Sequence, residues 1–193
     1  MQLLNGQYIH DFFNFKFADY YDINSLAHSL ALQNRYTGHS FYPVSVAQHL
    51  CLTSELALIH EEDISVIFAC HIHDLSEALA GDVNRCIKRL SGMEAYRERE
   101  HALELEIFQF HRLPTNSSFM EKISHYDNLA LSIEASQVMH YEHEAWNYIR
   151  THFPVIEGIY VHEIDWRTAK EAWLERYNQL SQEYMASEQY PFV

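Results

Sequence analysis

One segment of the chain, residues 71–82, places metal-binding side chains next to carboxylates that could move protons. It reads HIHDLSEALAGD, in which His73 and Asp74 are adjacent, Glu77 follows and Asp82 comes after a glycine. On an α-helix, residues three and four apart lie on one face, so His73 and Asp74 can converge with Glu77. The spacing therefore predicts half of a metal site, with Glu77 and Asp82 as catalytic carboxylates.

The remaining ligands must come from distant helices, because one imidazole and one carboxylate cannot close a coordination shell. His49 lies in PVSVAQHLCLTSELA, residues 43–57, where a proline and a serine open a helical pattern and place the histidine about two turns inside. Asp127 lies in HYDNLALSIEA, residues 125–135, an apolar helical segment in which an unpaired carboxylate would be costly to bury. Two histidines and two aspartates leave room for water and phosphate oxygens, whereas a structural site favours a closed, cysteine-rich shell.

The elements that hold these ligands are predicted to be helices packed into a single all-α domain. The chain has 193 residues, of which 48% are hydrophobic, with only five glycines and four prolines. That scarcity and the 3.6-residue periodicity indicate helices rather than a sheet. Helices are expected at about residues 23–34, 43–60, 62–79, 84–89, 93–111, 115–139, 141–151 and 166–186. We expect a short strand or extended arm within residues 1–22 and a hairpin or extended piece near residues 155–164.

Charge and composition exclude several classes of partner. The formal net charge is −14, and no basic face is evident, so binding to nucleic acid is not expected. The N-terminus lacks the basic start and apolar run of a signal peptide, and no stretch reaches the roughly 20 apolar residues that cross a bilayer. We therefore expect a cytoplasmic protein without membrane contact. The cysteines Cys51, Cys70 and Cys86 lack CxxC spacing and are expected to be reduced.

The order of the candidate ligands, His49, His73–Asp74 and Asp127, resembles that of the HD-domain metal-dependent phosphohydrolases. The blocks NRYTGHS, VAQHL and HDLSEALAGDVNRCIKR look like those of short phage and bacterial members of this family. Among them are bacterial 5′-deoxynucleotidases and phage dATP triphosphohydrolases of the DatZ type. The resemblance covers residues from about 23 to 150 and implies an HD-domain helical bundle, with residues 151–193 as a helical extension. Leu50 departs from the pattern, since a serine is common after the histidine in this group.

Basic side chains that flank the ligands suggest an anionic substrate. Lys88 and Arg89 could supply charge to phosphate, although an ordinary exposed helix end would look the same. By resemblance, Arg35 contacts phosphate, and Tyr36 abuts the sugar, where its bulk excludes a ribose hydroxyl. His39 in the same segment is a further candidate for phosphate contact.

The resemblance implies hydrolysis of a phosphoester at a divalent metal, with Glu77 handling the proton of the attacking water and Asp82 assisting. Three functions compete. The first is a dATP-preferring triphosphohydrolase, and the second is a 5′-deoxynucleotidase that acts on monophosphates. The third, a silent nucleotide-binding regulator, is disfavoured by the intact ligand set and by Glu77. The expected ion is Zn, Co or Mn, with Mg as an additional ion on the phosphates. Related enzymes form oligomers, so a homo-oligomer is expected, and the cytoplasm would be that of the host if a phage encodes the chain.

Overall fold

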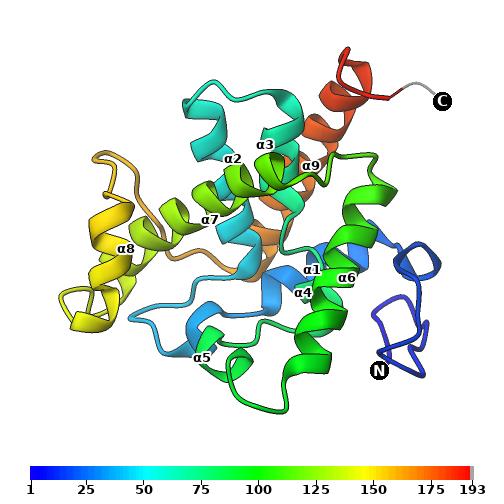
Figure 1. Cartoon of the computed structure of the whole chain (residues 1–193), viewed down its shortest axis with the longest axis horizontal. Coiled ribbons are helices and arrows are strands. Elements are labelled where there is room, and N and C mark those ends of the chain that lie inside the picture. Colours follow the sequence, from blue (N-terminus) through cyan, green and yellow to red (C-terminus); the bar gives the residue numbers. More distant parts are fainter. Residues whose placement is uncertain (192–193) are drawn as a thin grey trace.

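The computed structural model describes residues 1–191 and confirms the all-α prediction, since these residues contain helices and no β-strand (Figure 1). The α-helices are α1 (Ile23–Leu32), α2 (Val46–Ile59), α3 (Ile64–Ile72), α4 (Glu77–Ala80), α5 (Arg85–Lys88), α6 (Glu94–Phe110), α7 (Ser117–Val138), α8 (Asn147–His152) and α9 (Trp166–Ala186). Short 3-10 helices span η1 (Phe17–Tyr20), η2 (Arg35–Gly38) and η3 (Glu144–Trp146).

Helix α2 lies at the centre of the bundle, where it contacts α1, α3, α7 and α9. The sequence of α2 explains this position, because Val46, Leu50 and Leu56 are fully buried. A helix that is apolar around most of its circumference is stable only inside a bundle. Figure 1 shows α7 running across the molecule in front of α2, with α8 at one end of α7. Segments far apart in the sequence therefore meet around α2.

Helix α9 belongs to the core, although the sequence placed it in an extension. It packs against α1, α2 and α3, and Trp173 is fully buried. The indole N–H of Trp173 donates to the His71 carbonyl oxygen at 3.3 Å, and the His71 ring stacks on the indole at 5.1 Å. His71 is thus a buried core histidine, as expected for a residue two positions before His73.

Two predicted helix boundaries near the ligands are wrong. Helix α2 begins at Val46 rather than near residue 43, so His49 sits in its first turn instead of two turns inside. Helix α3 ends at Ile72, and the chain then passes through tight turns before α4 begins at Glu77. The backbone bonds from Leu75 N–H to the Ile72 carbonyl oxygen (2.9 Å) and from Glu77 N–H to the Asp74 carbonyl oxygen (3.0 Å) join residues three apart. This winding is tighter than that of an α-helix, so the helical spacing assumed between His73 and Glu77 does not hold, although residues 64–72 are helical as predicted.

The segments expected as strands adopt irregular structure. Residues 1–22 contain one isolated bridge, between Gln2 and Tyr8, and the helix η1. Residues 155–164 follow the surface without pairing to another strand. Nowhere in residues 1–191 does a helix combine the length and the apolar character that crossing a bilayer requires.

Burial keeps the half-buried His111 neutral, and a chain of hydrogen bonds orients its ring. Its Nδ1 donates to the Ile107 carbonyl oxygen at 2.8 Å, so Nε2 accepts from the Tyr177 hydroxyl at 2.8 Å. The Tyr177 hydroxyl also pairs with that of Tyr21 at 2.8 Å. Burial lowers the pKa of His111 from its ordinary value of 6.5 to about 4.

We expect His111 to make the fold less stable as the pH falls from about 6.5 to about 4. In this window the unfolded chain binds a proton that the folded chain excludes, so stability rises with pH, by about 1.4 kcal/mol per unit. When the pH is lowered from 7 to 5, the free energy of unfolding of His111→Gln should therefore fall by about 2 kcal/mol less than that of the unaltered protein. Urea unfolding of both proteins at the two pH values measures this difference, and equal losses would contradict the prediction.

Candidate metal centre

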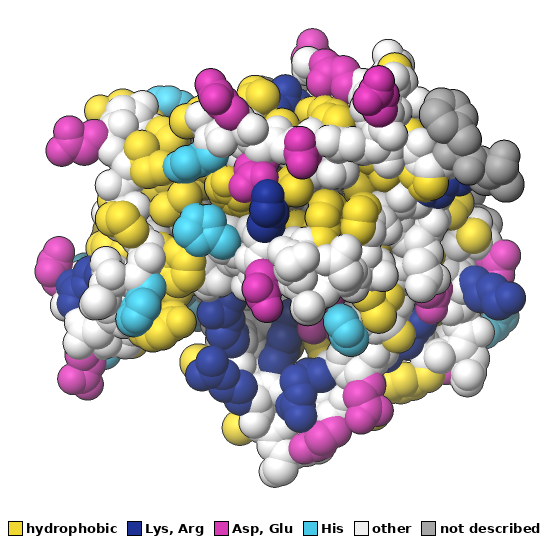
Figure 2. All heavy atoms as spheres, turned by 45° about the horizontal axis from the view of Figure 1, so that its top comes forward, with side chains coloured by type: hydrophobic (Ala, Val, Ile, Leu, Met, Phe, Trp, Pro, Cys, Tyr) yellow, Lys and Arg dark blue, Asp and Glu magenta, His cyan; other side chains and the backbone are white. Residues whose placement is uncertain are grey.

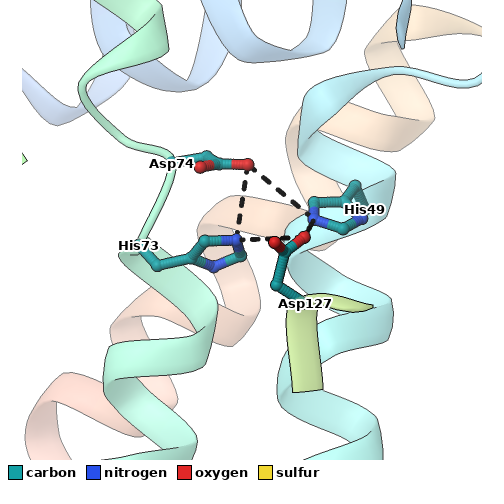
Figure 3. Close-up of side chains that lie close together, drawn as sticks. All are labelled: His49, His73, Asp74 and Asp127. Carbon is teal, nitrogen blue, oxygen red and sulfur yellow. Dashed lines mark ion pairs between the residues drawn. The ribbon is translucent and has the colours of Figure 1, made fainter. Parts of the chain in front are cut away.

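Four side chains from three parts of the chain converge between α2, α3 and α7 (Figure 3). The Nε2 atom of His49 lies 3.1 Å from an Asp127 oxygen and 3.8 Å from an Asp74 oxygen. The Nε2 atom of His73 lies 3.3 Å from the same Asp74 oxygen and 3.9 Å from the same Asp127 oxygen. One potential ligand atom from each residue falls within 4.8 Å of all the others. The structure thus brings together the four residues that the sequence predicts as ligands.

Local structure aims both imidazoles at this point. A capping box starts α2, with Ser45 Oγ accepting from Gln48 N–H (3.2 Å) and Gln48 Oε1 accepting from Ser45 N–H (3.0 Å). It fixes the first turn, which carries His49. At the end of α3, Nδ1 of His73 donates to the Cys70 carbonyl oxygen at 2.9 Å. When the ring is neutral, this bond leaves the Nε2 lone pair of His73 free to bind a metal.

The polar environment of the cluster fits a divalent cation. Both Nε2 atoms are buried and have no hydrogen-bond partner of good geometry, although buried polar atoms are normally paired. Burial alone would lower the pKa of His73, yet the Asp74 and Asp127 carboxylates raise it well above its usual range. Likewise, burial would raise the pKa of Asp74, but His73 lowers it to about 2. The carboxylates thus attract positive charge, and a divalent metal can replace the protons. This cluster can therefore hold a divalent metal ion.

Glu134 is one of two residues at this site that the sequence pattern did not predict. Its carboxylate, on α7, is 1% exposed, and its Oε1 accepts from Nδ1 of His49 at 3.0 Å. Its Oε2 accepts from Arg35 Nε and from the Tyr36 hydroxyl, each at 3.0 Å. Burial opposes ionisation, but the Arg35 charge and then His49 lower the pKa of Glu134, so the carboxylate is ionised. Glu134 therefore fixes the His49 ring, with Nε2 toward the ligand cluster.

A Glu134→Gln substitution is expected to weaken metal affinity by about tenfold to 100-fold, the usual effect of removing a partner of a metal-binding histidine. Glutamine fills the same space but cannot accept from His49, Arg35 and Tyr36 with a full negative charge. Calorimetric titration of the metal-free protein with Zn²⁺ or Mn²⁺ measures the change. The matched control is Glu121→Gln, at an exposed position of the same helix. Equal affinities in the two variants would remove Glu134 from this role.

The turn that carries Arg35 and Tyr36 has an unusual backbone. Tyr36 (φ 59°) and Thr37 (φ 54°) both adopt the left-handed region, which non-glycine residues seldom occupy. The bond from Arg35 N–H to the Val44 carbonyl oxygen (2.8 Å) and the two side-chain bonds to Glu134 hold this turn. Such conformations concentrate at functional sites, where surrounding contacts maintain them. The guanidinium of Arg35 thereby reaches within 3.9 Å of Asp74.

Glu77 and Asp82 lie beside the ligands, at the two ends of a short clamped segment. Gln33 donates to the Glu77 carbonyl oxygen at 2.9 Å, and its Oε1 accepts from Asp82 N–H at 2.8 Å. Gly81 makes the turn between them at φ 84°, which a side chain would disfavour. Burial raises the pKa of Glu77 well above its usual range, and the charges of Asp74 and Asp82 raise it further. One Glu77 carboxyl oxygen is buried without a hydrogen-bond partner, so this group can exchange a proton with a molecule in the site.

A cavity of about 1050 Å³ opens directly over the ligand cluster. It is lined by the acidic residues Asp74, Glu77, Asp82 and Asp127, by the predicted contact residues Arg35, Tyr36, His39, Lys88 and Arg89, and by Arg85. Figure 2 shows Lys and Arg side chains gathered around a hollow in the lower part of the molecule. A divalent ion held by these ligands would add to the four acidic and four basic side chains of the wall and make its charge net positive. The cavity therefore suits an anionic ligand.

The basic side chains that line the cavity differ in how closely a carboxylate pairs with them. Lys88 Nζ pairs with Glu100 at 2.7 Å, so its charge is shared. Arg85, which the sequence analysis did not select, is 58% exposed at its side chain and comes within 4.0 Å of Asp127. Its position one turn before Lys88 and Arg89 was the available signal, since residues three and four apart share a helix face. Arg85 thus joins the predicted contact residues at the cavity.

The fold and the site define an all-helical protein with a two-histidine, two-aspartate centre that can hold a divalent metal ion. No protein-family model matches the chain. The chain is similar to YfdR of Escherichia coli (strain K12), an uncharacterized protein, with 31% identity over 137 residues. The match covers 71% of this chain and 68% of YfdR. The chain therefore belongs to the same protein family as YfdR.

Proposed function

We propose that this chain is a metal-dependent HD-domain phosphohydrolase that converts a deoxynucleoside triphosphate, with dATP as the preferred substrate, to deoxynucleoside and triphosphate. The observation that carries the proposal is the shared cavity, in which the His49, His73, Asp74 and Asp127 cluster meets basic side chains and a carboxyl group of raised pKa. Neither a purely structural metal site nor a silent binding site requires Glu77 in this place.

The chemistry follows from where each group lies. A divalent ion bound by the four ligands would polarise a phosphoryl oxygen and lower the pKa of water. Glu77 accepts a proton from the water that adds to the α-phosphorus, and the bond from that phosphorus to the 5′ oxygen breaks. Glu77 then returns this proton to the 5′ oxygen, which leaves as the hydroxyl of the deoxynucleoside, with triphosphate as the second product. Arg35 and Lys88 stabilise the negative charge that develops on the phosphate oxygens. Asp82 lies where it can assist the proton transfer.

The contacts of Arg35 and Tyr36 support a place for sugar and phosphate beside the ligands. Glu134 engages the Nε of Arg35, so the rest of the guanidinium can contact phosphate. The Tyr36 hydroxyl is bound to Glu134, so its ring is held at the cavity wall, where it could block a ribose 2′-hydroxyl. His39 and Arg89 line the same cavity and complete the proposed substrate contacts.

Hydrolysis of a deoxynucleoside monophosphate is the alternative, since the same ligands and the same proton acceptor serve both reactions. The supply of basic side chains favours more than one phosphate, because Arg85, Lys88 and Arg89 extend the positive charge beyond Arg35. Zn, Co or Mn suits the imidazole and carboxylate ligands, and Mg could accompany the phosphates. Homo-oligomerisation and a cytoplasmic location stay predictions.

One experiment decides among these functions. The protein, loaded in turn with Zn²⁺, Co²⁺ or Mn²⁺, is incubated with each dNTP and each dNMP, and chromatography identifies the products. Triphosphate and deoxynucleoside from a dNTP would support the proposal, and orthophosphate from a dNMP would support the alternative. Absence of turnover with every nucleotide and metal would overturn both.

A further inference from the structure

The cavity over the ligand cluster has a second, apolar end that the phosphate chemistry does not use. This end is lined by Leu131, Met139, Ala145, Trp146, Tyr148 and Ile149. They come from the last turns of α7, from the segment that follows, from η3 and from α8. A single cavity thus joins a charged end, suited to phosphate, to an apolar end built from different parts of the chain. Small-molecule sites commonly combine an apolar wall with a few oriented polar groups.

Two aromatic side chains dominate the apolar end. Trp146 is half-buried, and its ring centre lies 6.5 Å from that of Tyr36 at an interplanar angle of 71°. Tyr36 in turn belongs to the turn that Glu134 holds beside the metal ligands. Tyr148, two residues after Trp146, is 65% exposed and also lines the cavity. The indole is therefore within aromatic contact of the residue that flanks the charged end.

The segment that presents these rings is firmly anchored. The buried Ser132 hydroxyl on α7 pairs with the Tyr141 hydroxyl at 2.6 Å and donates to the Phe153 carbonyl oxygen, so it holds both sides of the segment. Arg150 donates to the Tyr141 carbonyl oxygen at 3.1 Å, and Ile149 is buried. Because these aromatic side chains are already held in place, fewer groups lose conformational freedom when a ligand binds, which favours affinity.

The geometry points to a nucleobase subsite at this end, with the planar base against Trp146 and with Tyr148 at its outer edge. This inference rests on the proposed function, because a nucleotide whose phosphates lie beside Arg35 and the ligands carries its base away from them. An aromatic heterocycle is the part of a nucleotide that gains most from contact with an indole face. Charged residues are absent among the six side chains that line the apolar end, so the wall favours an uncharged ring.

A comparison of substrates with and without a base tests this subsite. The two substrates are a dNTP and 2-deoxyribose 5-triphosphate, which has the same sugar and phosphates. We expect Trp146→Ala to lower kcat/KM for the dNTP about tenfold or more, and to leave the base-free compound within about twofold. Trp146→Phe keeps an aromatic face and should restore most of the loss. Tyr160→Ala is the matched control, because Tyr160 is 69% exposed and lies outside the cavity lining. Equal losses on both substrates would overturn the inference while leaving the proposed function intact.

A binding measurement separates the inference from catalysis altogether. Deoxynucleosides carry no phosphate to be hydrolysed, and they should quench the fluorescence of Trp146 when they bind. The quenching is expected to disappear in both Trp146→Phe and Trp146→Ala and to persist in Tyr160→Ala. If the protein hydrolyses no nucleotide, the proposed function fails, and this titration alone decides the subsite. Quenching that survives removal of Trp146 would place the base elsewhere.

Discussion

Replacement of Asp74 by alanine is expected to leave the protein unable to retain a metal ion and without measurable phosphohydrolase activity. Asp74 offers one oxygen to the point where the Nε2 atoms of His73 (3.3 Å) and His49 (3.8 Å) converge. Removal of a residue that hydrogen-bonds to a metal ligand lowers metal affinity by about tenfold to 100-fold. Removal of a ligand itself should lower the affinity by at least the upper value. Metal analysis after dialysis measures occupancy.

A second readout for Asp74→Ala needs no turnover. A metal that binds only the folded state stabilises it by about 2.7 kcal/mol at a concentration 100 times the dissociation constant. Addition of Zn²⁺ or Mn²⁺ should therefore raise the Tm of the unaltered protein and of the exposed-site control Asp19→Ala, but not that of Asp74→Ala. The quantity compared is the metal-induced change in the Tm of each protein, because removal of the Asp74 carboxylate from the buried His73 lowers the metal-free Tm as well. A metal-induced rise in the Tm of Asp74→Ala that matches the control would exclude Asp74 from the centre.

The ligands were predictable from the sequence because their residue types are rare in apolar helices. Asp127 stands in a segment most of whose residues are buried, so its carboxylate needed a partner. Glu134 follows Asp127 by two helical turns and thus shares its face, and its apolar surroundings offered the same signal. The sequence could not predict that Glu134 bonds to His49, because this contact depends on how α7 crosses α2.

The boundary at Ile72 was missed because tertiary contacts override local periodicity, whereas the start of α2 is set locally by the Ser45–Gln48 capping box. Residues 62–79 read as one helix, but the chain after Ile72 is turned by bonds between residues three apart and clamped by Gln33. The sequence pairs Glu77 with His73 through helical spacing, whereas in the structure a tighter turn joins Glu77 to Asp74 through a backbone hydrogen bond. The ligand set was predictable despite the wrong local geometry, because the residue types and their order carry the chemistry.

The structure also changes what a substitution at Arg35 would mean. The Glu134 carboxylate is fully enclosed, and Arg35 is the largest of the charges that keep it ionised. Removing one partner of a buried ion pair commonly destabilises a protein by about 3–5 kcal/mol. A loss of activity in Arg35→Ala would therefore have two possible causes, the loss of a phosphate contact and a change in the position of His49, and the measurement would not separate them. Substitutions at Glu77 avoid this difficulty, because its buried carboxyl oxygen has no partner to lose.

A Glu77→Gln variant is expected to bind metal and nucleotide with near-normal affinity while its kcat falls by about 100-fold to 10000-fold, the usual range for a positioned acid or base. Glutamine matches the shape of glutamate but cannot accept the proton of the attacking water. The raised pKa of Glu77 supports this role, because burial and the Asp74 and Asp82 charges make its carboxylate a stronger base than an exposed glutamate. Proton exchange is most efficient when the pKa lies near the working pH.

Steady-state kinetics and metal titration of Glu77→Gln, with Glu121→Gln as the exposed control, separate the two effects. Normal metal affinity with a fall confined to kcat would assign proton transfer to Glu77, because a structural role would change KM and stability together. A kcat within a few-fold of normal would move that role to Asp82. The Asp82 carboxyl is held at the other end of the segment clamped by Gln33, and burial raises its pKa as well. Asp82→Asn would then show the large loss, since both acids line the same cavity.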